Sequence, residues 1–383
     1  MNFQPLKIFL DTCLPMLSVP GSDTVIYKGR EEVFRYQSGY ENIRQGTPVN
    51  PDSLYHMYSI TKVSLSVAAT QLIEKGEIMI TDPLYAYFPE YRHMGIKVTD
   101  SNGRVDIVEA KNPILIKHLL SMTSGMGYDL DSRESIKRVK AQTNGKCPTL
   151  DVIRALASDP LDFEPGTDYR YGMSLDVIGG VIELVSGMKL SDYMRENIFE
   201  PLGMYNTSFG LTESKLSRIA TQYRYDEKNK TAVEIPKDFN EYVFGSEYDS
   251  GGAGVISCVS DQILLADALT HLGLGKNGGR ILSSYGVNLM RTNILEGRAL
   301  DTYNKTKHVY GYGYGYGVRT NLNPYLSGNL MPKGEFGWDG ARLSYFSSCP
   351  ESGISIFHAE HMGGLHGTVI PRLRNVIYSC LDD

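Results

Sequence analysis

The sequence predicts an α+β fold in which both ends of the chain contribute strands to one antiparallel sheet. Residues 24–36 contain two strand patterns around a Lys-Gly turn, and more strand patterns lie at 310–319, 343–346 and 353–358. Between these ends, apolar residues recur at helical spacing. Strands at both ends with helices in the middle indicate a sheet flanked by helices, plus a mainly helical subdomain.

The composition is that of an ordinary globular protein, with 42% hydrophobic and 21% charged residues in a chain of 383. A net charge of −6 and the lack of a basic run argue against nucleic-acid binding. No apolar run reaches the length of a transmembrane helix. Five scattered cysteines, without a Cys-x-x-Cys pair, favour reduced thiols in a cytoplasmic protein over disulfides or a zinc site.

The first residues predict an amphipathic helix, because Leu6, Phe9, Leu10 and Leu14 fall at helical spacing. Asp11 interrupts the apolar run that a cleaved leader needs. We therefore expect this segment to pack against the fold.

More helical patterns follow along the chain, separated by two polar stretches at 128–148 and 211–249 whose position relative to any pocket is left open. The strict Gly-Tyr alternation of 310–319 predicts one strand, with a glycine face that another element can approach closely. The helical patterns lie at 63–75, 114–120, 150–157, 175–186, 190–199, 260–272 and 369–381.

Ser59 and Lys62 stand at the start of the first of these helices, which stops at Gly76. A spacing of three places an amine beside a hydroxyl on one helix face. A buried lysine with a lowered pKa can take the serine proton, so Ser59 is a candidate nucleophile and Lys62 its base. Ser-x-x-Lys recurs at 186–189, but there it contains a glycine and lies between helices, which indicates a turn.

Four further segments, together with the Ser59 helix, resemble the serine β-lactamase and penicillin-binding-protein family, and most of all its class C β-lactamase-like branch with esterase and D-amino-peptidase relatives. They occur in the family's order, and the resemblance covers roughly residues 20 to 346. It implies a β-lactamase/transpeptidase-like fold and an acyl-serine enzyme. The segments are IKHLLSMTSG at 116–125, EPGTDYRY at 164–171, FEPLGM at 199–204 and SGGAG at 250–254.

The resemblance implies a role for each matching residue. Ser59 attacks a carbonyl, Lys62 deprotonates it, and Tyr171 passes the proton to the leaving group. Lys62 and Tyr171 are expected to titrate as a coupled pair. The backbone N–H groups of Ser59 and Ala341 form the oxyanion hole. We interpret 1–383 as one unit, with an α/β subdomain of approximately 1–58 and 255–383, a helical subdomain of approximately 59–254, and the active site at their junction.

Two departures from the β-lactamase pattern favour the esterase-type branch. Met173 stands where β-lactamases carry an asparagine that holds the substrate amide. Trp338-Asp339, followed by Gly340, stands where they carry a Lys-Thr or similar pair that steers the substrate carboxylate. Losing these anchors weakens β-lactam turnover more than ester cleavage. Arg342, which the strand pattern places on the same face as Trp338, is a candidate replacement for the lost positive charge. These five residues are the candidate substrate-binding set.

Structural interpretations of the same residues remain open. Ser59 can be a helix cap with Lys62 at the surface, Tyr171 and Trp338 can be core aromatics, and Arg342 can be a solvated strand residue. The three histidines of 358–366 lack metal-site spacing, so we expect no metal and no cofactor. A Gly-x-Ser-x-Gly elbow is absent from the sequence, so no motif indicates a Ser-His-Asp hydrolase.

The sequence thus predicts a metal-free serine hydrolase that acts on small esters or amides, as a carboxylesterase or peptidase. A true class C-type β-lactamase or a D-alanyl-D-alanine carboxypeptidase is the alternative within enzymes. A catalytically idle penicillin-binding or ligand-sensing relative is the alternative outside them. The natural acyl group and the oligomeric state stay open.

Overall fold

A central sheet dominates the computed structural model, which describes residues 1–129, 133–307 and 309–381. In these ranges the sheet has eight strands, and every neighbouring pair is antiparallel. The strand order is β11 (Tyr312–Tyr314), β12 (Arg319–Asn321), β13 (Phe336–Asp339), β14 (Tyr345–Cys349), β15 (Ile354–Glu360), β1 (Gly21–Lys28), β2 (Glu31–Asn42) and β3 (Thr47–Pro48). Because β1 pairs with β15, both ends of the chain build one sheet, as predicted.

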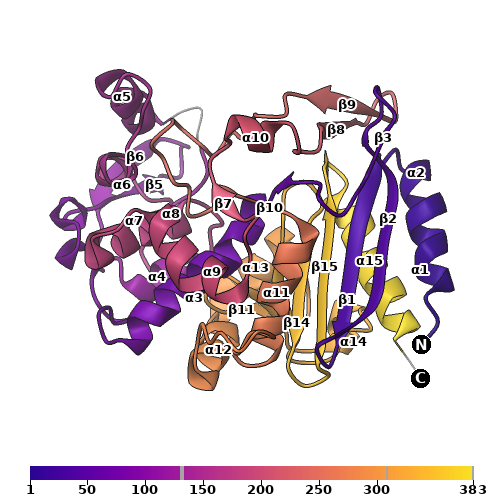
Figure 1. The fold of residues 1–383 in the computed structure, drawn as a ribbon. Helices are drawn as coiled ribbons and strands as arrows, with labels where there is room; N and C mark the ends of the chain where they lie inside the picture. The colour runs from indigo at the N-terminus through magenta and orange to yellow at the C-terminus, as the bar shows by residue number, and fades with distance from the viewer. Residues whose placement is uncertain (130–132, 308, 382–383) are drawn as a thin grey trace.

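Helices cover this sheet on both faces, since every residue of β15 is buried. Helix α11 (Val259–Thr270) packs on β1, β14 and β15. Helix α15 (His366–Cys380) packs against α1 (Gln4–Ile8), and Asn2 N donates to Cys380 O at 3.2 Å, so the two ends of the chain lie side by side (Figure 1). The predicted amphipathic N-terminal helix is confirmed; it continues through η1 (Phe9–Cys13) and α2 (Leu14–Met16).

A helical region lies on the other side of the molecule from the chain ends (Figure 1). Its centre is α3 (Thr61–Glu74), which is buried from Thr61 to Leu72 and packs on α7 (Ser174–Ser186), α8 (Leu190–Met194) and α12 (Ser284–Arg291). The predicted apolar helix after Ser59 is therefore confirmed. The other helices are α4 (Ile116–Leu120), α5 (Glu134–Gln142), α6 (Thr149–Leu156), η6 (Arg195–Phe199), α9 (Glu200–Leu202), α10 (Glu213–Leu216), α13 (Gly297–Lys307) and α14 (Pro324–Ser327).

A short sheet connects the two regions near Ser59. Strand β10 (Val255–Ser257) lies between β4 (Tyr55–His56) and β7 (Ser208–Phe209). Met57 N donates to Val255 O at 2.9 Å, and Val255 N donates to Thr61 Oγ1 at 3.1 Å. These bonds place the glycine turn before β10 against the start of α3. The strands of the short sheets are β4 (Tyr55–His56), β10 (Val255–Ser257), β7 (Ser208–Phe209), β16 (Met362–Gly363), β8 (Gln222–Asp226), β9 (Thr231–Ile235), β5 (Gly95–Thr99) and β6 (Val105–Glu109).

Two local predictions were wrong. The Gly-Tyr run of 310–319 is not one strand: β11 ends at Tyr314 and β12 begins at Arg319, with Gly317 at φ +69° in the turn between them. The glycine face is approached closely, since a Cβ at Gly317 would lie 2.1 Å from Ser66 Oγ. Arg342 does not share a strand face with Trp338, because β13 ends at Asp339 and a turn follows.

Of the polar stretch 128–148, residues 130–132 lie outside the described residues. Helix α5 forms half of the remainder. The subdomain boundaries at 58/59 and 254/255 remain a prediction. Within the ranges that the structure describes, none of the helices combines the length and the apolarity needed to cross a bilayer.

Candidate active site

Ser59 lies in a single 3₁₀ turn, η2 (Tyr58–Ile60), directly before α3. The preceding residue, Tyr58, has φ +47°, a left-handed conformation that costs a non-glycine residue about 1–3 kcal/mol. Two contacts hold it there: its hydroxyl donates to Gln222 Oε1 at 2.6 Å, and the Arg342 guanidinium lies 5.1 Å from its ring centre. The surrounding fold therefore fixes the turn that presents Ser59.

Lys62 is completely buried one turn along the same chain segment. Its Nζ donates to Gly252 O at 2.6 Å, to Tyr128 Oη at 2.9 Å and to Ser59 Oγ at 3.3 Å. The three ammonium protons thus have three acceptors. Burial lowers the pKa of Lys62 to about 7, against an opposing effect of the Asp176 carboxylate, so the neutral amine is accessible near neutral pH.

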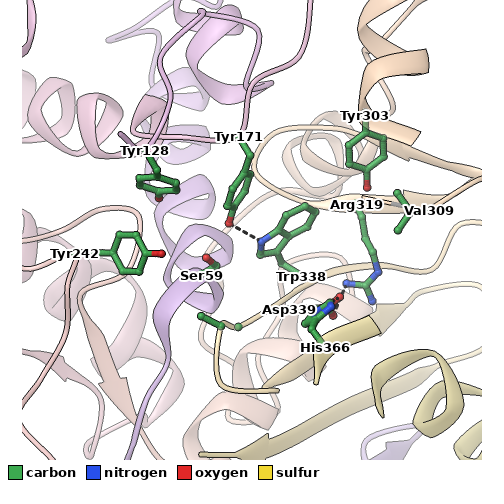
Figure 2. A pocket seen from close by; sticks show the side chains of 12 residues that line it. Ser59, Tyr128, Tyr171, Tyr242, Tyr303, Val309, Arg319, Trp338, Asp339 and His366 are labelled. Carbon is green, nitrogen blue, oxygen red and sulfur yellow. Dashed lines mark hydrogen bonds and ion pairs between the residues drawn. The ribbon is translucent and has the colours of Figure 1, made fainter. Parts of the chain in front are cut away.

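Tyr171 and Trp338 form one wall above Ser59. The indole Nε1 of Trp338 donates to Tyr171 Oη at 2.9 Å, and the two rings are stacked with centres 5.6 Å apart (Figure 2). The Tyr171 ring centre lies 4.9 Å from Lys62 Nζ. The hydroxyl of Tyr171 is therefore held by an uncharged donor at the mouth of the Ser59–Lys62 pair.

Aromatic side chains enclose a cavity of about 260 Å³ beside Ser59. Figure 2 shows Tyr128 and Tyr242 on one side of Ser59, and Tyr303 and Val309 on the far side of Trp338. Tyr128 and Tyr242 come from the two polar stretches, and their ring centres lie 5.0 Å apart. Among the residues that the structure describes, the lining is Ser59, Tyr128, Tyr171, Tyr242, Tyr303, Val309, Arg319, Trp338, Asp339, Gly340, Ala341 and His366.

A buried ion network closes one end of this cavity. Asp339 accepts from Arg374 at 2.6 Å and from Arg319 at 3.2 Å, and His366 lies 3.3 Å away. Arg319 also pairs with Glu335 at 2.9 Å. Burial alone would raise the pKa of Asp339, but the two guanidinium groups outweigh it and hold the pKa well below its usual range.

Comparison with known proteins identifies the family. A family profile described as Beta-lactamase matches residues 13–359. The chain belongs to the beta-lactamase family. This confirms the resemblance seen in the sequence.

Relatives within the beta-lactamase family include enzymes named for acyl transfer and ester cleavage. Acyltransferase calJ of Penicillium decumbens is 28% identical over 368 residues, 90% of this chain and 84% of that protein. Esterase EstB of Burkholderia gladioli is 26% identical over 284 residues, 69% of each. The solved structure of EstCE1, a hydrolase with promiscuous acyltransferase activity, has a TM-score of 0.79 at 22% identity and covers 99% of this chain and 97% of that one. The predicted β-lactamase/transpeptidase-like fold is confirmed.

The fold brings most of the predicted site residues of this beta-lactamase-family chain together. Met173 is an exception: it is buried at the start of α7, outside the cavity lining. Arg342 also lies outside the lining, and its guanidinium covers the Tyr58 ring. Lys62 is buried behind Ser59. The predicted residues in the lining are Ser59, Tyr171, Trp338, Asp339, Gly340 and Ala341.

Several residues that line or contact the site were missed, including Tyr303, Val309, Arg319 and His366 of the lining. Tyr128 and Tyr242 lie in polar stretches without periodicity, which hid their role. Gly252 was noted only within the SGGAG segment at 250–254, and Asp176 only as part of a helix. A signal existed for Asp176, because an aspartate on an otherwise apolar helix needs a buried partner.

The three histidines of 358–366 separate in the fold. His358 lies between Thr24 and Glu360 within the sheet, and His361 stacks on Tyr55. His366 is the one that reaches the cavity lining. Across the part of the chain that the structure describes, no group of three or more histidine, cysteine, aspartate or glutamate side chains is arranged to hold a metal ion.

Proposed function

We propose that this protein is a serine hydrolase that cleaves small esters through an acyl-Ser59 intermediate. The hydrogen bonding of Lys62 carries the proposal. When Lys62 is a neutral amine, its two N–H groups remain bonded to Gly252 O and Tyr128 Oη, and its lone pair is directed at the third partner, Ser59 Oγ, at 3.3 Å. With a pKa of about 7, the amine is matched to general-base work at neutral pH.

The proposed reaction combines this geometry with the roles that the family resemblance implies. Ser59 Oγ bonds to the ester carbonyl carbon while its proton passes to Lys62 Nζ. The backbone N–H groups of Ser59 and Ala341 receive the oxyanion. Tyr171 then delivers a proton to the leaving alcohol as its C–O bond breaks, and Lys62 restores that proton to Tyr171. Water attacks the acyl-Ser59 carbonyl in the second half, with Lys62 and Tyr171 in the reverse roles.

The cavity walls support an ester with a small, apolar or aromatic acyl group. At about 260 Å³ the space is below the usual range of roughly 300–1,000 Å³ for drug-sized ligands. Arg319 is the only arginine or lysine in the described part of the lining, and it is already paired with Glu335 and Asp339. An amide anchor such as the β-lactamase asparagine is replaced by Met173.

The reduced cysteines support our expectation of a cytoplasmic location.

Intact-protein mass spectrometry tests the proposal. Wild type, Ser59→Ala and the control Ser64→Ala are exposed briefly to a p-nitrophenyl ester and, separately, to a penicillin. Ser64 is a buried serine on the same helix that bonds only to Thr61 O among the described contacts. We expect ester turnover and an acyl adduct in wild type and Ser64→Ala, and neither in Ser59→Ala.

The penicillin arm separates the alternatives. A persistent penicillin adduct on Ser59 accompanies the esterase function, because the deacylation step is built for small esters. Rapid penicillin hydrolysis would instead identify a β-lactamase, and cleavage of a D-alanyl-D-alanine peptide a carboxypeptidase. A folded protein that forms no adduct with either compound would be an idle, ligand-sensing relative.

Acyl transfer is a second candidate function, supported by calJ and EstCE1, whose names state this activity. The acyl-Ser59 ester is attacked by an alcohol in place of water, and the aromatic walls favour such an acceptor. Adding a small alcohol during ester turnover is expected to yield a transesterified product in proportion to alcohol concentration. Hydrolysis product alone, at any alcohol concentration, would exclude this activity.

A further inference from the structure

Asp176 is a buried carboxylate that the mechanism above does not use. It lies in the first turn of α7, five residues after Tyr171, with 3% of its surface exposed. Its Oδ1 accepts from Ser250 Oγ at 2.8 Å, from Tyr248 Oη at 3.0 Å and from Gly252 N at 3.2 Å. Burial raises the pKa of Asp176, and the Lys62 charge and these three donors oppose the rise. Three donors on one oxygen favour the ionised form, which a buried carboxylate without partners would not keep.

The peptide group of Gly252 links this carboxylate to Lys62. Its N–H donates to Asp176, and its carbonyl accepts from Lys62 Nζ at 2.6 Å. A Cβ at Gly252 would lie 2.5 Å from Asp176 Oδ2 and 2.8 Å from Tyr128 Oη, so both side chains contact this backbone directly. Position 252 therefore needs glycine, and the carboxylate fixes which way the carbonyl points.

We propose that Asp176 is a positioning residue for Lys62: through Gly252 it aligns the amine on Ser59, and its negative charge, held by Tyr248 and Ser250, sets how readily Lys62 is protonated. This rests on the proposed function. The groups that face Lys62 from the surrounding elements are Ser59, Tyr128, the Tyr171 ring, Gly252 and Asp176, and only Asp176 carries a carboxylate. Among these groups, Asp176 is thus the sole counter-charge.

The charge acts on Lys62 in a defined direction. Burial lowers the pKa of Lys62, and the Asp176 carboxylate opposes this. Asp176→Asn keeps the size and an acceptor oxygen but removes the charge. The pKa of Lys62 then falls further, and an opposite charge at short range typically accounts for about 1–3 pH units. Because the amine is the active form, the acid limb of Ser59 reactivity moves to lower pH by about one unit or more.

The test follows the rate of Ser59 phosphonylation by a fluorophosphonate, read as adduct mass on the full chain across pH. Wild type, Asp176→Asn, Ser59→Ala and the control Asp261→Asn are compared. Asp261 is a similarly buried aspartate on α11 that accepts from Asn206 N and Thr207 Oγ1, outside the cavity lining. We expect the acid limb to shift in Asp176→Asn and to stay at its wild-type position in Asp261→Asn.

The outcomes separate this inference from the function on which it rests. Ser59-dependent labelling with an unshifted limb in Asp176→Asn overturns the role of Asp176 and leaves the hydrolase proposal intact. No Ser59-dependent labelling in wild type overturns both. If thermal unfolding shows that Asp176→Asn does not fold, Tyr248→Phe with Ser250→Ala decides. That double variant removes two of the three donors that stabilise the Asp176 carboxylate, so the acid limb of Ser59 labelling must also move to lower pH. An unshifted acid limb in this variant overturns the proposal.

Discussion

Replacing Trp338 with phenylalanine removes one hydrogen bond and leaves an aromatic ring in its place. The bond runs from Trp338 Nε1 to Tyr171 Oη at 2.9 Å, on the oxygen that we propose to transfer a proton. A bond to the neutral phenol contributes about 0.5–1.5 kcal/mol, and one to a charged oxygen about 1.5–3 kcal/mol. The difference, about 1–1.5 kcal/mol, is felt only as charge develops on Tyr171.

That difference corresponds to a loss of roughly tenfold in kcat, with KM little changed. The assay compares a p-nitrophenyl ester with an alkyl ester of the same acid. A p-nitrophenolate leaves without a proton, so the loss is expected to be larger for the alkyl ester, whose alkoxide needs one.

Tyr314→Phe is the matched control for Trp338→Phe. The Tyr314 ring packs edge-on against Trp338 at 5.0 Å, and its buried hydroxyl has no hydrogen-bond partner in the described part of the chain. Its removal should leave kcat unchanged. If Trp338→Phe matched this control, or raised KM for both esters with kcat intact, the indole N–H would have no part in proton transfer.

Further changes test the site and the fold. Ester hydrolysis should rise with pH through about 7, because Lys62 is a base only after it loses its proton; a rate that is flat from roughly pH 5 to pH 9 would contradict this. Tyr128→Phe removes one acceptor from the amine and should lower kcat about tenfold, a cost typical of one lost hydrogen bond in a reacting group, measured by steady-state kinetics. Asp339→Asn leaves two buried guanidinium groups undercompensated, so urea unfolding should show a loss of about 3–5 kcal/mol. Because the pKa of Asp339 is depressed, this stabilisation is present above its unfolded value of about 4 and is lost as pH falls below it. Gly317→Ala should lower the thermal midpoint more than Gly278→Ala, since both have positive φ but only position 317 meets a neighbouring side chain.

The fold was predictable where a signal repeats along the chain. Helical and strand periodicities are local, and they located α3, α7, α11 and the strands at both ends. The Gly-Tyr run shows the limit of prediction from periodicity. The alternation continues without a break from β11 into the turn, so Gly317, which turns the chain, looks like every other glycine in the run. The strand pattern also failed at Arg342. The strand ends at Asp339 and a turn follows, so the Arg342 guanidinium lies over the Tyr58 ring.

The candidate site, like the fold, was predictable only where its residues are close together in the sequence. Ser59 and Lys62 are three residues apart, so their spacing along the chain is enough to indicate the pair. Asp176 and Gly252 are 76 residues apart, and only tertiary packing through β10 and α3 brings them to Lys62. Tyr128 is similarly placed by the loop after α4. The Ser59–Lys62 pair, whose members are close in sequence, could therefore be predicted. The residues that surround Lys62 from distant parts of the chain could not.

Trp338 is the only tryptophan of the chain, and 8% of its surface is exposed, toward the cavity. Its indole contacts Tyr171 and Tyr314 directly, and through them a series of ring contacts that continues to Tyr128 and Tyr242. Tryptophan emission from this protein therefore comes entirely from the wall beside Ser59, and tyrosines excited nearby pass their energy to it. The protein thus carries its own optical probe, and we expect its emission to change on ligand entry and on the proposed acylation of Ser59, without any added label.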